Sequence, residues 1–144
     1  MIHSIALLCL FLLFANLLLA ESWTVLVYMA ADNNLAEMGK LDINSMESVD
    51  QPVNLNLIVQ ADFPEGAKRY KVQKDNSGLI TSPVIGNLGS IDSGNPQTLK
   101  QFMAWGFAAY PSERKMLVIW SHGDSWYKGK DKWICPDEGS ENLM

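Results

Sequence analysis

The stretch MLVIWSHGDSW at residues 116–126 indicates a buried strand that ends in the pair His122 and Gly123. Open α/β sheets bind their ligands at the carboxyl ends of their strands. His122 is also the only histidine downstream of the first 20 residues. A histidine at a strand end, followed by a glycine that leaves the backbone accessible, predicts a general base beside a substrate. The alternative is an ordinary loop histidine that follows a strand, and the pattern alone favours neither.

Strands and helices are predicted to alternate along the chain. The apolar run at residues 23–31 suits a strand covered on both faces, and alternating residues predict a second strand over 53–61. Apolar residues at helical spacing predict a helix over about 34–49, and an Asn-Pro pair predicts another from 95 to about 110. With a third strand at 116–121, this order predicts an α/β fold with a mainly parallel sheet and helices on both faces.

A β-hairpin is predicted after the second strand, within residues 69–85. Its strands are expected at 70–73 and 79–81, on either side of the turn signal DNSG at 75–78. Residues 86–95, rich in Gly, Ser and Asn, are predicted to form a loop. The hairpin therefore interrupts an otherwise parallel αβ order.

The sequence after Trp126 turns polar and charged, which predicts a surface loop. The strand at 116–121 would then be the last element of the sheet and would have an unpaired edge. We therefore expect the chain to be the N-terminal fragment of a longer protein, with a domain that is incomplete at its C-terminus.

Residues 1–20 are predicted to be a signal peptide, because they are almost entirely apolar and end in the small residue Ala20. The alternative is an uncleaved anchor, although the apolar run is short for a membrane span. Only this leader, if uncleaved, suggests a membrane contact. We expect residues 21–144 to form one domain of a secreted or otherwise extracytoplasmic protein, in the periplasm or at the cell surface.

The composition excludes some classes of function. A net charge of −5 without a basic stripe argues against nucleic-acid binding. After the leader the chain has one cysteine, Cys135, which lies in the charged stretch and is a poor candidate nucleophile. No spacing typical of metal ligands is present. Ser121 is adjacent to His122, but neighbours on a strand point to opposite faces, so the two are not expected to form a catalytic pair.

Polar side chains are predicted along the same sheet edge as His122. Asp32, Asn33 and Asn34 follow the first strand, and Asp62 follows the second. Because the carboxyl ends of parallel strands share one edge, Asp32, Asn33 and Asp62 are candidates for the rim of a substrate site. The alternative is that Asp32 or Asn33 caps the next helix, and the two roles are compatible.

Two longer stretches resemble the clostripain family of cysteine peptidases. WTVLVYMAADNNL at 23–35 is similar to the family's opening strand, and residues 89–126, with GSIDSGNPQTL and LVIWSHGDSW, are similar to a later part. The resemblance implies a caspase-like α/β/α sandwich around a mainly parallel sheet. It also implies an endopeptidase that acts on protein or peptide substrates through a Cys–His dyad.

The resemblance assigns roles to two residues. His122 matches the family's catalytic histidine and Gly123 its oxyanion-hole glycine. In the related caspases the histidine lies about 50 residues before the nucleophilic cysteine, which would place that cysteine near position 170, past residue 144. The acidic residue behind a preference for Arg or Lys before the scissile bond is expected there too, so the fragment alone should be inactive.

The resemblance also suggests calcium and self-cleavage. Some family members use calcium, although no calcium-binding spacing is visible in this sequence. Lys128, Lys130 and Lys132 are candidate self-cleavage sites, and a solvated run of charges is the alternative.

Two other functions stay open. One is a non-catalytic surface or binding protein with a caspase fold, a pseudopeptidase, in which the strand after His122 lacks the cysteine. The other is a different extracytoplasmic α/β hydrolase, in which His122 serves another nucleophile and thiol alkylation leaves the activity intact.

Overall fold

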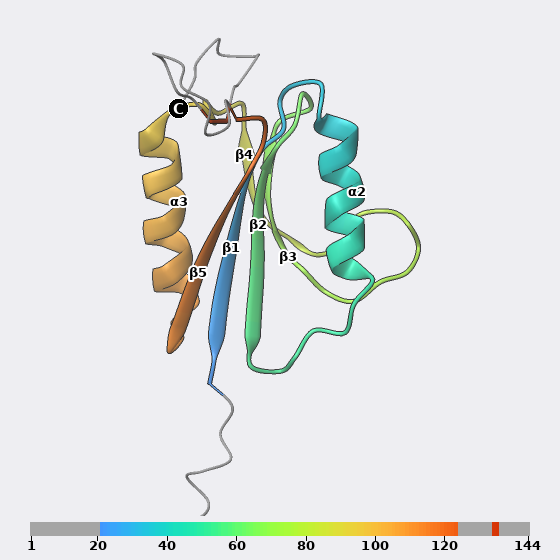
Figure 1. Ribbon diagram of the computed structural model, residues 1–144, viewed down its shortest axis with the longest axis vertical. Coiled ribbons are helices and arrows are strands. Elements are labelled where there is room, and N and C mark those ends of the chain that lie inside the picture. Colours follow the sequence, from blue (N-terminus) through green and yellow to red (C-terminus); the bar gives the residue numbers. More distant parts are fainter. Residues whose placement is uncertain (1–20, 124–133, 136–144) are drawn as a thin grey trace, which may run out of the picture.

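The computed structural model describes residues 21–123 and 134–135, and in this part of the chain five strands form one sheet with a helix on each face (Figure 1). The strand order is β4-β3-β2-β1-β5. β1 pairs in parallel with β2 and β5, and the hairpin of β3 and β4 extends the sheet antiparallel to β2. The elements are β1 (Trp23–Ala30), α2 (Ala36–Glu47), β2 (Leu55–Asp62), β3 (Ala67–Lys71), β4 (Val84–Gly89), α3 (Pro96–Ala109) and β5 (Arg114–Trp120).

The predicted alternation of strands and helices is confirmed. β1 contributes side chains to the buried clusters on both faces of the sheet. On one face its residues Val27 and Met29 pack in a buried cluster with Ile43 of α2. On the other face Leu26 and Tyr28 pack with Phe102 of α3. The continuous apolar run of β1 therefore reflects a strand that is covered on both faces.

Glycines let both helices lie close to β1. A Cβ added at Gly106 of α3 would lie 2.7 Å from both methyl carbons of Leu26. A Cβ at Gly39 of α2 would lie 2.9 Å from the sulfur of Met29. Because the core is packed at this spacing, a larger residue at Gly106 would push α3 away from the sheet.

The hairpin follows β2 as predicted, but the prediction of its strands was wrong. Its first strand is Ala67–Lys71 rather than 70–73, and its second is Val84–Gly89, within and beyond residues that were expected to be a loop. Residues 79–81 are not a strand. The connection between the two strands is therefore much longer than a short turn at 75–78.

The reason is a long-range contact with Glu47 at the end of α2. One oxygen of this buried carboxylate accepts hydrogen bonds from Thr81 N at 3.1 Å and Ser82 N at 2.7 Å. The backbone carbonyl of Glu47 accepts another from Asp75 N at 2.8 Å. The backbone amides of residues 75, 81 and 82 therefore bind Glu47 instead of an opposing strand. The second strand of the hairpin, β4, begins only after them, at Val84.

The strand predicted at residues 116–121 is present as β5, but the expectation that it is buried was wrong. Met116, Val118 and Ile119 of β5 are exposed. β5 is the last strand at one side of the sheet, and β1 is its one neighbour within the described ranges. Its apolar side chains therefore lack the cover that a second neighbour and its helix would supply.

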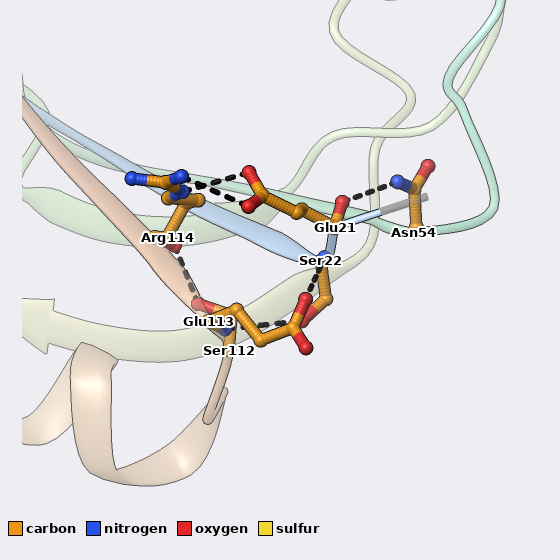
Figure 2. A network of polar contacts seen from close by, with 6 residues as sticks. All are labelled: Glu21, Ser22, Asn54, Ser112, Glu113 and Arg114. Carbon is orange, nitrogen blue, oxygen red and sulfur yellow. Dashed lines mark hydrogen bonds and ion pairs between the residues drawn. The ribbon is translucent and has the colours of Figure 1, made fainter. Parts of the chain in front are cut away.

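The N-terminal ends of β1, β2 and β5 are joined by exposed polar contacts (Figure 2). Arg114 donates two hydrogen bonds to the Glu21 carboxylate, at 2.7 and 2.8 Å. Asn54, just before β2, donates to Glu21 O at 2.5 Å. In the described residues, no helix is both long and apolar enough to span a bilayer.

Candidate active site

Parallel pairing brings the carboxyl ends of β1, β2 and β5 to one edge of the sheet. Ala30 at the end of β1 is opposite Asp62 at the end of β2. Met29 of β1 is opposite Trp120, the last residue of β5. These ends lie together at the top of Figure 1. The residues that follow β1, β2 and β5 therefore lie along one edge of the sheet, as predicted.

The turn after β1 is fixed to the end of β5 by a network around Asn33, whose side chain is 7% exposed. Ser121 Oγ donates to Ala30 O at 2.6 Å. Asn33 Nδ2 donates to the same carbonyl at 3.1 Å and to Ser121 Oγ at 3.4 Å. The Ser121 hydroxyl is therefore engaged with β1, in line with the expectation that it does not pair with His122.

Asn33 orders the chain before α2 without capping the helix in the predicted way. Its Oδ1 accepts from Leu35 N at 2.9 Å, and its carbonyl accepts from Ala36 N at 3.1 Å. Leu35 is itself the N-cap residue of α2, and its side chain makes no capping hydrogen bond. Asn33 thus sets the shape of the turn that leads into the helix.

His122 leaves β5 with its imidazole held by the turn after β1. Its Nε2 lies 2.6 Å from Oδ1 of Asn34, and both residues are at least partly exposed. The sequence placed Asn34 on the same edge but did not reveal this contact. The two residues are 88 positions apart, so no local pattern in the sequence signals the contact.

Gly123 follows on the exposed side, where it pairs with Ile134 in an isolated antiparallel bridge. Cys135 N donates to His122 O at 3.1 Å across the same pairing. Within the described ranges, the Gly123 amide donates no hydrogen bond to another protein group.

Cys135 is buried, which corrects its predicted place in a surface loop. Its side chain packs between the layers with Tyr28 and Phe102. Burial raises the pKa of the thiol to about 11, so the thiolate is scarce at neutral pH. A neutral, inaccessible thiol is a poor nucleophile. The neighbouring lysines at 128, 130 and 132 lie outside the described residues.

Asp32 and Asp62 meet at a pocket next to the His122 edge. The pocket has a volume of about 190 Å³, and Glu65 and Ser90 also line it. Asp62 is 2% exposed, whereas Asp32 is partly exposed. The structure thus brings two of the three predicted rim residues together, on the β2 side of the β1 turn, and His122 does not line this pocket.

The suggested use of calcium can be compared with the arrangement of carboxylates in the described residues. Calcium takes six to eight oxygen ligands, several of them carboxylates. Among residues 21–123 and 134–135, no group of three or more His, Cys, Asp or Glu side chains is placed to hold a metal ion.

The comparisons with known proteins decide the family. The model of the clostripain family matches residues 27–144. The chain belongs to the clostripain family. No curated protein matches it in sequence.

Solved structures of cysteine proteases have the same fold. A cysteine protease of B. fragilis is 30% identical, with a TM-score of 0.65 over 78% of this chain and 98% of that one. A secreted cysteine protease of Bacteroides thetaiotaomicron, in complex with an irreversible peptide inhibitor, is 30% identical, with a TM-score of 0.69 over 87% of this chain and 36% of that one. An inactive zymogen from Parabacteroides distasonis is 25% identical, with a TM-score of 0.65 over 78% of this chain and 34% of that one.

This clostripain-family chain therefore has the predicted caspase-like α/β fold, with three parallel strands extended into a mixed sheet by the β-hairpin after β2. It is related to enzymes that are cysteine proteases, and so to proteins that act on peptides or proteins. It spans about a third of the length of two of these relatives.

Proposed function

We propose that this clostripain-family chain is the N-terminal part of a secreted cysteine endopeptidase in which His122 is the catalytic acid and base. The observation that carries the proposal is the place of His122. It follows β5 at the carboxyl edge of the sheet, and its imidazole is held by Asn34 at 2.6 Å. A histidine at this edge, partly exposed and held by a second side chain, has the features of a general base.

In the proposed reaction a cysteine thiolate attacks the carbonyl carbon of a peptide bond. His122 takes the thiol proton and then gives it to the leaving amine as the C–N bond breaks. A thioester acyl-enzyme remains, and His122 removes a proton from the water that hydrolyses it. Gly123 N–H, which donates no hydrogen bond to another group within the described ranges, would stabilise the oxyanion.

The proposed nucleophile is not Cys135, because that thiol is buried and its pKa is raised to about 11. We assign the role to a cysteine beyond residue 144, at the end of a strand that would pair with β5. The exposed apolar residues of β5 support this strand, because a further neighbour would cover them. The acidic residue that would confer a preference for Arg or Lys before the scissile bond is expected in the same part.

Asp32 and Asp62 are proposed to form the substrate rim, since both line the pocket beside the β1 turn. Asn33 would support this rim, because its side chain is buried and hydrogen-bonded to Ala30 O and Leu35 N. Residues 1–20 are proposed to be a signal peptide that directs the remaining domain, from residue 21, out of the cytoplasm. A secreted relative from Bacteroides thetaiotaomicron supports that location.

The test is hydrolysis of fluorogenic peptide amides with Arg, Lys, Leu or Asp before the scissile bond. We expect the gene product that extends past residue 144 to cleave the Arg or Lys substrates, and the 144-residue chain to be inactive. His122→Ala should lower kcat/KM by about 100-fold or more, the range for loss of a general acid and base. The control is Ser112→Ala, at the opposite end of the sheet, which should keep full activity.

Three results would contradict the proposal. Hydrolysis by the 144-residue chain alone would mean that the nucleophile lies within it. Full activity of His122→Ala would remove the histidine from the mechanism. Activity that survives iodoacetamide would point to a nucleophile other than cysteine.

A further inference from the structure

An apolar groove lies between α2 and the connection from β3 to β4. Figure 1 shows this connection looping beside α2. The groove has a volume of about 400 Å³, which falls within the range of about 300–1,000 Å³ that is usual for ligand sites. Its lining side chains include Lys40 and Leu41 of α2 and Leu79 and Ile80 of the connection. The groove is therefore large enough to take a side chain of a bound molecule.

Hydrogen bonds fix the connection to α2 at the groove. Asn44 Nδ2 donates to Gly78 O at 2.9 Å. A few residues later, the backbone amides of Thr81 and Ser82 donate to the buried carboxylate of Glu47. Both walls of the groove are thus held in place before a ligand binds, which lowers the entropic cost of binding.

The side chains that border the groove are apolar and exposed. Leu41 is 55% exposed and Leu79 is 70% exposed, and Met38, one turn before Leu41 in α2, is 51% exposed. Exposed apolar side chains that gather around a hollow are typical of a binding site. The charged neighbour Lys40 is already paired with two carboxylates, at 2.9 and 2.8 Å. The groove therefore favours an apolar group over an ion.

A smaller pocket connects this groove with the pocket at the rim of the candidate active site. It has a volume of about 150 Å³ and shares Lys40 and Ile80 with the groove. With the rim pocket, which Asp32 and Asp62 line, it shares three residues of the turn after β2, namely Phe63, Glu65 and Gly66. A polypeptide that lies across the rim can therefore continue along α2 into the groove.

We propose that the groove is a remote substrate site that binds an apolar side chain of the polypeptide whose cleavage is assigned to His122. The inference rests on the proposed function and deepens it by naming a feature of the substrate. Leu41 lies about 7.5 Å along α2 from the first residue of the helix, Ala36, which is near the carboxyl edge. An extended chain covers about 3.3 Å per residue. The bound side chain should therefore lie at least about three residues from those held at the rim.

The test compares short and long substrates of the gene product that extends past residue 144. The short ones are the fluorogenic amides, which end at the rim. The long ones carry about eight Gly and Ser residues on each side of the cleaved bond, roughly 26 Å of extended chain, with a single Leu moved through these positions. We expect Leu to lower KM about tenfold at one or two positions, as partial burial of a leucine side chain would.

Variants of the groove test whether it is the source of this gain. In Leu41→Gln and Leu79→Gln, long peptides with and without Leu should have the same KM. The matched control is Val53→Gln, at a fully exposed apolar residue before β2 and outside the groove. It should keep full activity and the whole effect of Leu.

Three results would overturn the inference. One is a KM that does not depend on the position of Leu, and another is a dependence that Leu79→Gln leaves intact. The third is a melting temperature that Leu79→Gln lowers well beyond Val53→Gln, because the groove would then be covered by another part of the protein.

The failure of the proposed function would be recognised separately. If the gene product cleaves none of the amides, the peptidase assignment fails, and fluorescence anisotropy of a labelled Leu peptide decides whether the groove binds peptides. Binding that is weakened by Leu79→Gln and not by Val53→Gln supports the groove as a peptide site. Equal binding by both variants overturns it.

Discussion

The two ends of the parallel strands β1, β2 and β5 are joined by side chains that differ in exposure. At the N-terminal end the contacts between Glu21, Ser22, Glu113 and Arg114 are open to water (Figure 2). At the carboxyl end the central side chain is Asn33, which is buried. Both networks join neighbouring strands, but only the second lies beside the candidate catalytic residue.

The difference in exposure shows at which end hydrogen bonds can fix the positions of side chains. Water competes for every donor and acceptor at the N-terminal end, so exposed ion pairs there contribute little to the free energy of unfolding. A buried hydrogen bond has no such substitute, and breaking it leaves groups without partners at a cost of about 1–3 kcal/mol. The buried contacts of Asn33 therefore hold the turn after β1 more firmly than the exposed contacts hold the N-terminal end.

The largest effect is expected from Asn33→Ala. The change leaves Leu35 N without its acceptor and removes one donor to Ala30 O, so the free energy of unfolding should fall by about 2 kcal/mol. The matched change at the other end is Asn54→Ala, whose lost contact to Glu21 O water can replace, with an expected cost within about 0.5 kcal/mol. Urea unfolding measures both, and equal losses would abolish the distinction between the ends.

The second largest effect is expected at alkaline pH, where the free energy of unfolding should fall because of Cys135. The pKa of Cys135 is about 11 in the folded chain and near 9.0 in the unfolded one. Between these values the unfolded chain loses the proton and the folded chain keeps it. Stability therefore falls as pH rises, by about 1 kcal/mol near pH 10. Cys135→Ala should flatten this part of the profile, and an unchanged slope would contradict the assignment.

Ser121→Ala should cost about 1 kcal/mol, because a buried carbonyl, Ala30 O, loses its hydroxyl donor. Ser112 is the counterpart at the N-terminal end, where its hydroxyl donates to Arg114 O at 2.7 Å. Ser112→Ala should cost less, since water reaches that carbonyl. Thermal unfolding of both variants tests the contrast, which fails if Ser112→Ala is the more destabilising change.

Periodicity predicted the framework because it is a local property of the chain. The apolar run of β1, the helical spacing in α2 and the Asn-Pro start of α3 each depend on residues near in sequence, and all three elements formed. Parallel alternation then placed Asp32, Asp62 and His122 on one edge without further information. The fold class and the edge of the candidate site were therefore predictable.

The features that the sequence did not predict depend on contacts between residues far apart in the chain. The second strand of the hairpin begins only after residues 81–82, because Glu47 binds the backbone amides of these two residues, which lie 34 and 35 positions after it. The burial of Cys135 depends on Tyr28 and Phe102, which no spacing near Cys135 records. The Asn34–His122 contact joins residues 88 positions apart. Partners this distant in sequence come from the packed fold, so patterns of neighbouring residues cannot name them.

The smallest effect is expected at the N-terminal end, from Arg114→Gln. Arg114 lowers the pKa of Glu21 chiefly by hydrogen bonding, so the pair's contribution is present above the ordinary carboxyl pKa of 4.5 and is lost as pH falls through the lowered value. Both groups are exposed, and salt screens the pair. The melting temperature should fall slightly at pH 7 in low salt, and the difference should vanish in 1 M salt or at pH 2. A loss as large as that of Asn33→Ala, or one that salt does not reduce, would mean that the exposed end holds the strands as firmly as the buried one.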